Sequence, residues 1–332
     1  MTVLIDTIDP DDLGELADFH DAGHGTADDF LADMLNGLRQ AQKEISCKYF
    51  YDKRGSALFD EICDLEEYYP TRTELSILAT RAPEIASLAG PAAHLVEFGS
   101  GSSSKVRLLL NAMEAPSSYV AVDISRDHLI ASTRDLASEY LNIDVVPVCA
   151  DYTREFELPT GLQGENITGF FPGSTIGNFA PEQAATFLGR WAKVLGSGAG
   201  LVIGVDLKKP RALLEAAYND ARGVTAEFNE NLLVRANTEL NADFDLSAFA
   251  HDARWNEAAG RIEMHLVSQR DQTVNIADHA FDFQADETIH TENSHKYGLT
   301  QFTEMAERAG WDAATTWTDP DNLFSVHFLR AR

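Results

Sequence analysis

A glycine turn between an apolar run and a helical segment is the first feature of this sequence that could do chemistry. The run His94–Phe98 ends in Gly99-Ser100-Gly101, and helical periodicity resumes at Lys105. Glycines at such a turn let the backbone approach a ligand closely, and the start of a helix presents free N–H groups to it. A dinucleotide fingerprint needs a third glycine where Ser104 stands. The turn therefore favours a different nucleotide-like cofactor, and an NAD-dependent oxidoreductase is kept as an alternative.

Acidic residues follow the next two apolar runs. Asp123 ends the run that begins at Ser118, and Asp151-Tyr152 follows Val145–Cys149. Together with Glu97 before the glycine turn, these residues fit S-adenosylmethionine (SAM). Asp123 would bind the ribose hydroxyls, and Asp151 and Tyr152 would contact the edge and the face of the adenine. We therefore predict that SAM is the cofactor and that it binds beyond the ends of these three strands.

The elements that must position these residues alternate regularly. Five short apolar runs are separated by segments with helical periodicity, as expected for strands buried on both faces of a parallel sheet. The predicted strands are His94–Phe98, Ser118–Val122, Val145–Cys149, Thr168–Phe171 and Gly200–Val205. The predicted helices between them are Lys105–Met113, Asp127–Tyr140 and Pro181–Leu195. This pattern predicts a doubly wound, Rossmann-like α/β domain.

The alternation breaks after residue 207. Two longer stretches, Arg261–Ile276 and Ala280–His290, alternate enough to predict an antiparallel hairpin, and α/β character returns near residue 298. We predict a Rossmann-like domain over residues 73–207 and 298–332. A second, α+β substrate domain would contain residues 1–72 and 208–297.

The composition excludes several classes of partner. The 332 residues include 53 Asp and Glu against 26 Lys and Arg, a net charge of −27. Binding to nucleic acid phosphates needs a basic surface, and an anionic membrane repels an acidic one, so neither partner is expected. No positively charged leader is apparent, because the first basic residue is Arg39, and the three cysteines lack metal-ligand spacing. We expect a cytoplasmic protein without a bound metal.

Several further motifs resemble those of a known family. They are Lys48-Tyr49-Phe50-Tyr51-Asp52, Tyr68-Tyr69-Pro70-Thr71-Arg72-Thr73-Glu74, Gly173-Ser174-Thr175-Ile176-Gly177-Asn178, the segment from Tyr218 to Asn229, Arg261-Ile262-Glu263-Met264 and Thr291-Glu292-Asn293-Ser294. In this order and spacing they resemble the histidine Nα-methyltransferases of the ergothioneine pathway, over about residues 45–330. The resemblance implies a SAM-dependent enzyme of two domains, expected to be monomeric. Its substrate would be free L-histidine, trimethylated through mono- and dimethyl intermediates to hercynine.

The resemblance also implies roles for individual residues. Tyr68 and Asn178 would hold the substrate carboxylate, with Gly173 at the mouth of their loop, and Tyr218 would lie beside the reacting amine. Glu292 and Ser294 would bind the imidazole, and Met264 would form a wall of the pocket. The residues implied for SAM are Tyr51, Gly99, Ser100, Lys105, Asp123, Asp151 and Tyr152.

The residue types suit this chemistry. Residues two apart on a strand share a face, so Glu292 and Ser294 can bind both ring nitrogens of an imidazole. An indole or a phenol cannot use both partners, which opposes the alternative of a tyrosine or tryptophan Nα-methyltransferase. Asn178 can donate to a carboxylate without adding charge. A catalytically silent SAM-binding module is a third alternative, opposed by the intact set of pocket residues.

Overall fold

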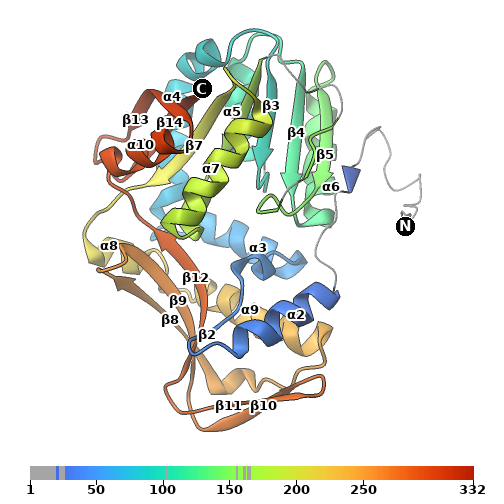
Figure 1. Ribbon diagram of the computed structural model, residues 1–332, viewed down its shortest axis with the longest axis vertical. Helices are drawn as coiled ribbons and strands as arrows, with labels where there is room; N and C mark the ends of the chain where they lie inside the picture. The colour runs from blue at the N-terminus through green and yellow to red at the C-terminus, as the bar shows by residue number, and fades with distance from the viewer. Residues whose placement is uncertain (1–19, 22–26, 102, 155, 160–161, 163–165) are drawn as a thin grey trace.

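The computed structural model describes residues 20–21, 27–101, 103–154, 156–159, 162 and 166–332. Two main sheets lie one above the other along the long axis of the molecule (Figure 1). Part of the predicted second domain, residues 1–19 and 22–26, falls outside the described residues. Within the described ranges, no helix is both long and apolar enough to cross a membrane.

The larger sheet has eight strands and places the predicted glycine turn at its centre. Its spatial order is β1 (His20–Asp21), β5 (Asp144–Cys149), β4 (Ser118–Asp123), β3 (His94–Phe98), β6 (Ile167–Phe171), β7 (Gly200–Asp206), β14 (Phe324–Ala331) and β13 (Trp311–Thr318). The strands are parallel from β1 to β7, and β14 and β13 are antiparallel. The chain order reverses at β3, where a doubly wound sheet has its ligand crevice. The predicted α/β, Rossmann-like fold is confirmed.

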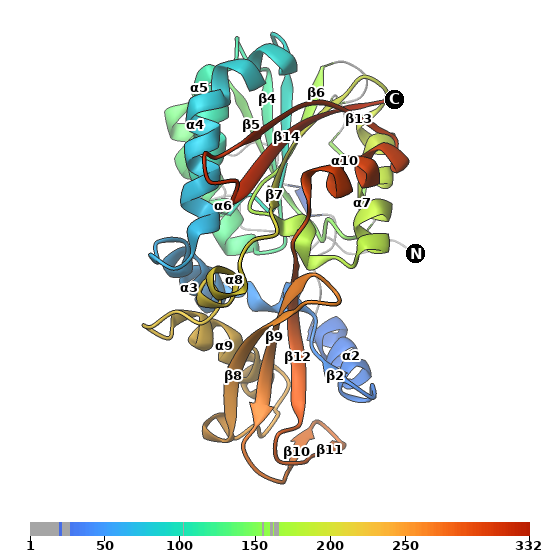
Figure 2. The same ribbon diagram turned by 90° about the vertical axis from the view of Figure 1, so that its left-hand side faces the viewer.

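Helices cover both faces of this sheet, because its strands carry apolar side chains on both sides. α4 (Tyr69–Ala89), α5 (Ser104–Ala112) and α6 (Arg126–Glu139) cover one face, and α7 (Pro181–Leu195) and α10 (Leu299–Arg308) cover the other (Figure 2). Successive residues of β3 alternate between the two cores, with Leu95 on the α4 side and Val96 on the α7 side. This alternation follows from the two-residue period of a strand.

The smaller sheet has four strands in the order β2 (Lys43–Glu44), β12 (Thr288–His295), β9 (Arg261–Ser268) and β8 (Phe249–Asn256). The helices nearby are α2 (Ala27–Leu38), α3 (Lys53–Cys63), α8 (Arg211–Ala216) and α9 (Val224–Glu239). One apolar core combines Phe30, Phe50 and Leu58 with Phe228 and Ile289, so segments far apart in the chain share it. The proposed domain boundaries at residues 72/73, 207/208 and 297/298 stay a prediction.

The predicted hairpin of two long strands is wrong in its details. Arg261–Ile276 forms two strands, β9 and β10 (Gln272–Ile276), and the following stretch forms β11 (His279–Phe283) and β12. β9 pairs with β12, and the short β10–β11 hairpin projects from their connection. The pattern also missed β8. It is an edge strand with only Phe249 and Ala253 buried, so its apolar alternation is weak.

Candidate active site

The glycine turn at the end of β3 adopts a conformation that glycine favours. Gly99 has φ +75° and Gly101 has φ +47°. The backbone N–H of Gly99 donates to the Val122 carbonyl at 2.8 Å, which fixes the turn against β4. Asp123 at the end of β4 accepts from the N–H of Ser125 at 2.8 Å and from that of Gly101 at 3.4 Å. Burial raises the pKa of Asp123, and these N–H donors oppose the rise. The turn and the carboxylate thus form one unit.

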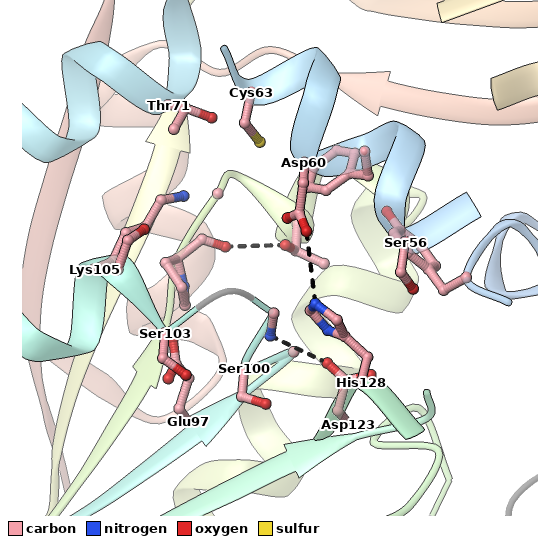
Figure 3. A pocket seen from close by; sticks show the side chains of 18 of the residues that line it. Ser56, Asp60, Cys63, Thr71, Glu97, Ser100, Ser103, Lys105, Asp123 and His128 are labelled. Carbon is pink, nitrogen blue, oxygen red and sulfur yellow. Dashed lines mark hydrogen bonds and ion pairs between the residues drawn. The ribbon is translucent and has the colours of Figure 1, made fainter. Parts of the chain in front are cut away.

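A cavity of about 460 Å³ opens directly over this unit (Figure 3). Of the residues predicted for the cofactor, six line it: Tyr51, Gly99, Ser100, Lys105, Asp123 and Tyr152. The Tyr152 ring lies 3.7 Å from the position that a Cβ on Gly99 would occupy, an ordinary van der Waals distance, so the ring lies beside the turn. Ser100 is buried in the cavity wall, and its hydroxyl has no hydrogen-bond partner among the described residues. A polar ligand with a ring system fits these features.

Asp151 does not line this cavity. It is buried at the end of β5, where its Oδ1 accepts from the N–H of Thr153 at 2.9 Å and from the hydroxyl of the same residue. Lys48 Nζ lies 4.0 Å from Asp151 Oδ2. The role of Asp151 at the adenine stays a prediction.

Sequence reasoning identified Glu97 but not its partner, and it missed a second pair at the cavity. Glu97, whose pKa burial raises to about 8, accepts from the Tyr119 hydroxyl at 2.5 Å beneath the glycine turn. On the opposite side, His128 Nε2 of α6 lies 3.6 Å from Asp60 Oδ2 of α3 (Figure 3). The hydrogen bond with Asp60 raises the pKa of His128. Helices from the two halves of the molecule therefore meet across the cavity.

A buried carboxylate connects the cofactor cavity to the predicted substrate loop. Glu74 of α4 is 1% exposed, and its Oε2 lies 2.7 Å from Lys105 Nζ. Both Glu74 oxygens also accept from the backbone N–H of Gly173, at 2.9 and 3.1 Å. Gly204 of β7 leaves room for this carboxylate, because a Cβ there would lie 2.0 Å from it. The sequence carried a signal for Glu74, since it lies on the helical face of the apolar Ile77 and Leu78.

The predicted substrate residues gather beside Tyr68, which lines the inner end of the cavity with Gly173. The Tyr68 and Tyr218 rings meet edge to face with centroids 6.1 Å apart. Tyr218 donates to Ser294 Oγ at 2.7 Å. Met264 of β9 pairs directly with Glu292 of β12, so the two side chains share one face of the small sheet.

Asn178 belongs to the same set of predicted substrate residues but comes from the larger sheet. It ends the 3₁₀ turn η2 (Thr175–Asn178) after β6, and its side chain is near enough to the Cys47 thiol to lower the pKa of that group. Burial raises the pKa of Cys47 to about 12, and the nearby Glu292 adds to the rise. Burial likewise raises the pKa of Glu292 to about 7, against the opposing effect of Lys296. The structure thus brings the residues predicted for the carboxylate and for the imidazole close to one another.

A second buried cluster was not predicted. The Lys296 ammonium lies 2.7 Å from Asp206 Oδ2, and both side chains are fully buried. Lys209 and Tyr69 also bond Asp206. In the part of the chain that the structure describes, no group of three His, Cys, Asp or Glu side chains could hold a metal ion.

A mainly parallel sheet with its crevice at a glycine turn, followed by a helix and an acidic residue on the next strand, is typical of the class of Rossmann-like enzymes that bind a nucleotide-like cofactor. Within this class, the chain belongs to the family described as histidine-specific methyltransferase, SAM-dependent, which matches residues 30–331.

Two bacterial relatives match nearly the whole chain. The histidine N-alpha-methyltransferases of Mycolicibacterium smegmatis and Mycobacterium tuberculosis are each 42% identical to it, over 92% of this chain and 96% and 95% of theirs. Ergothioneine biosynthesis protein 1 of Neurospora crassa is 30% identical over 88% of this chain and 33% of its own length. The chain therefore resembles the complete bacterial proteins and one part of the larger fungal protein.

Proposed function

We propose that this protein is a SAM-dependent histidine Nα-methyltransferase. It would convert free L-histidine through the mono- and dimethylated amino acids to hercynine, the first step of ergothioneine biosynthesis. The family match over residues 30–331 carries this proposal, because it spans the cofactor turn, the Gly173–Asn178 loop and the strand of Glu292 and Ser294.

Positioning of two ligands is the main task of the site. SAM, when bound, would supply a methyl group on its sulfonium: the α-amino nitrogen bonds to the methyl carbon as the sulfur–carbon bond breaks, and S-adenosylhomocysteine leaves. Transfer needs the amine lone pair about 3 Å from the methyl carbon, and most of the acceleration comes from holding the two in line. Tyr51, Gly99, Ser100, Lys105, Asp123 and Tyr152 surround the cofactor cavity, and Asp151 lies at its β5 side.

Substrate binding is assigned to the residues next to Tyr68. Tyr68 and Asn178 would hold the carboxylate near Gly173, and Tyr218 would contact the amine. The α-ammonium of free histidine loses one proton before the first attack, and the first two transfers each release one more; solvent can accept all three, because an α-amino group titrates near neutrality. No dedicated base is needed for this reaction.

Recognition of the ring is assigned to the four-stranded sheet. Glu292 and Ser294 would bind the two imidazole nitrogens, with Met264 as the apolar wall beside them. A buried site built for a ring N–H rejects analogues that lack it by orders of magnitude. This supports histidine over tyrosine or tryptophan.

The test is direct. The purified protein is incubated with SAM and, separately, with histidine, tyrosine or tryptophan, and product masses are measured. Histidine should yield a product heavier by three CH₂ units, with two lighter intermediates at early times. Methylation of another amino acid while histidine stays unmodified would overturn the proposed specificity.

We also propose a monomer that acts in the cytoplasm. The acidic composition, with 53 Asp and Glu among 332 residues, supports a protein surrounded by water. Light scattering during size-exclusion chromatography should give the mass of one chain, and cell fractionation should recover the activity in the cytosol. A dimer mass or a membrane-bound activity would contradict these two statements.

A further inference from the structure

The end of β7 and the end of β12 meet in a buried polar cluster under the substrate residues. The backbone N–H of Tyr297 donates to the Asp206 carbonyl at 3.0 Å, and that of Lys208 donates to the Tyr297 carbonyl at 3.0 Å. These two bonds place Lys296 directly against Asp206. Burying an isolated ammonium is costly, so its partners determine what Lys296 can do.

All three donors of the Lys296 ammonium have a partner. Nζ lies 2.7 Å from Asp206 Oδ2, 2.7 Å from Ser294 Oγ and 3.0 Å from Tyr218 Oη. An ammonium has three N–H donors and no acceptor, so this geometry requires the charged form. Burial lowers the pKa of Lys296, but the charge of Asp206 and the hydrogen bonds to Asp206 and Tyr218 outweigh it and the pKa is raised.

These contacts leave only the proton of the Ser294 hydroxyl available to a ligand. A hydroxyl has two acceptor lone pairs and one donor proton. Lys296 donates to Ser294 Oγ at 2.7 Å, and the Tyr218 hydroxyl donates to the same oxygen at 2.7 Å. Both lone pairs are therefore in use, and Ser294 can only donate to a further ligand.

The Tyr218 hydroxyl, in contrast, can only accept a hydrogen bond from a ligand. Its proton goes to Ser294, and one lone pair of its oxygen accepts from Lys296. The remaining lone pair can accept from a substrate N–H. An acceptor at the amine leaves the nitrogen lone pair unoccupied, as nucleophilic attack requires.

We infer that Lys296, held by Asp206, is a positioning residue that makes Ser294 a hydrogen-bond donor and Tyr218 an acceptor toward the substrate. The site then selects the neutral imidazole with its bare nitrogen at Ser294 and its N–H at Glu292. This inference rests on the proposed function, because it concerns histidine as the ligand. It adds a specificity residue that contacts no substrate atom itself.

The first test needs no substitution. Histidine labelled with ¹⁵N in the ring is bound to the unaltered enzyme with S-adenosylhomocysteine, which cannot donate a methyl group. The ¹⁵N spectrum should show one protonated and one unprotonated ring nitrogen, in a single tautomer. Two protonated nitrogens, or averaging between tautomers, would overturn the inference.

The second test uses matched lysines. Lys296→Met should raise the dissociation constant for histidine about tenfold, the effect of one lost hydrogen bond, and leave that for SAM within about twofold. Lys209→Met is the control, because Lys209 bonds Asp206 and Tyr69 but neither Tyr218 nor Ser294. It should change the histidine dissociation constant less than about threefold.

A double variant separates positioning from general structural support. In a Ser294→Ala background, Lys296→Met should cost less than about threefold in histidine affinity, because its route to the ring through Ser294 is gone and only its contact with Tyr218 remains. An undiminished tenfold loss would contradict the inference. If the unaltered enzyme methylates histidine but fails these tests, only the role of Lys296 falls; if it does not methylate histidine, the proposed function falls first.

Discussion

Glu74 Oε2 lies 2.7 Å from Lys105 Nζ, and this ion pair joins α4 to the first turn of α5 beside the cofactor cavity. Burial opposes the charge on Lys105, but Glu74 more than offsets it, so the pKa of Lys105 is raised. The same carboxylate holds the N–H of Gly173. One buried side chain therefore orders a predicted cofactor residue and the start of the predicted substrate loop.

Glu74→Gln should weaken the ordering of Lys105 and of the start of the substrate loop at Gly173. The amide can still accept from Gly173, but it leaves the Lys105 ammonium buried without its counter-charge, at a cost of about 3 kcal/mol in unfolding free energy. We expect SAM affinity to fall about tenfold, measured by calorimetry. Urea unfolding gives the stability change.

The matched control is a surface pair. Asp312, with a side chain 64% exposed, lies 2.8 Å from Arg332 Nε. Asp312→Asn should change the unfolding free energy by less than about 1 kcal/mol, because exposed pairs contribute little. Equal losses for both variants would contradict a special role for Glu74.

Removing the Tyr218 hydroxyl should impair the reaction rather than cofactor binding. Tyr218→Phe removes one hydrogen-bond partner from Lys296 and one from Ser294, and it removes the proposed contact to the amine. The kcat/KM for histidine should fall about tenfold to hundredfold, with the SAM dissociation constant unchanged.

Tyr297→Phe controls for the loss of a buried phenol oxygen. Tyr297 is 2% exposed, and its hydroxyl has no hydrogen-bond partner among the described residues. This variant should keep kcat/KM within about twofold of the unaltered enzyme. A comparable loss in both variants would show that Tyr218 acts only through packing.

The ionisation of Glu292 should be visible in the pH dependence of stability. Its pKa is raised by burial to about 7 in the folded protein, so between its ordinary value and pH 7 the folded state binds more protons than the unfolded state. Stability contributed by this group is therefore lost as the pH rises through that window. The side chain of the Glu292→Gln variant cannot ionise. The unfolding free energy of this variant minus that of the unaltered protein should therefore increase by up to about 3 kcal/mol between pH 4.5 and pH 8. Parallel urea-unfolding curves across this range would refute the assignment.

Two substitutions should change the affinities for SAM and for histidine independently. Asp123→Ala removes the acceptor that ties Gly101 and Ser125 together and should raise the SAM dissociation constant at least about tenfold, with a smaller effect on histidine. Glu292→Ala should do the reverse, with a loss of about a hundredfold for histidine. Calorimetric titration of each variant with each ligand measures all four values. Equal weakening of both ligands by Glu292→Ala would contradict its assignment to the ring.

The positions of the central strands and the cofactor turn were predictable because their signals are local. His94–Phe98 is apolar on both faces and ends in glycines, and the structure has the strand at the same residues. The interrupted hairpin and the edge strand β8 were not, since β8 buries only Phe249 and Ala253. Weakly buried strands depend on their neighbours rather than on their own periodicity.

The buried strands, the glycine turn and the motifs that mark the family could be identified without a structure, because each depends on neighbouring residues. Which charged side chains meet depends on the folding of distant segments onto one another. Glu74 and Gly173 are 99 positions apart, and Asp206 reaches Lys296 from the other sheet. A lysine or glutamate is usually exposed, and a local pattern such as the apolar face shared by Glu74 cannot name its partner; the fold supplies that partner and excludes water from the pair.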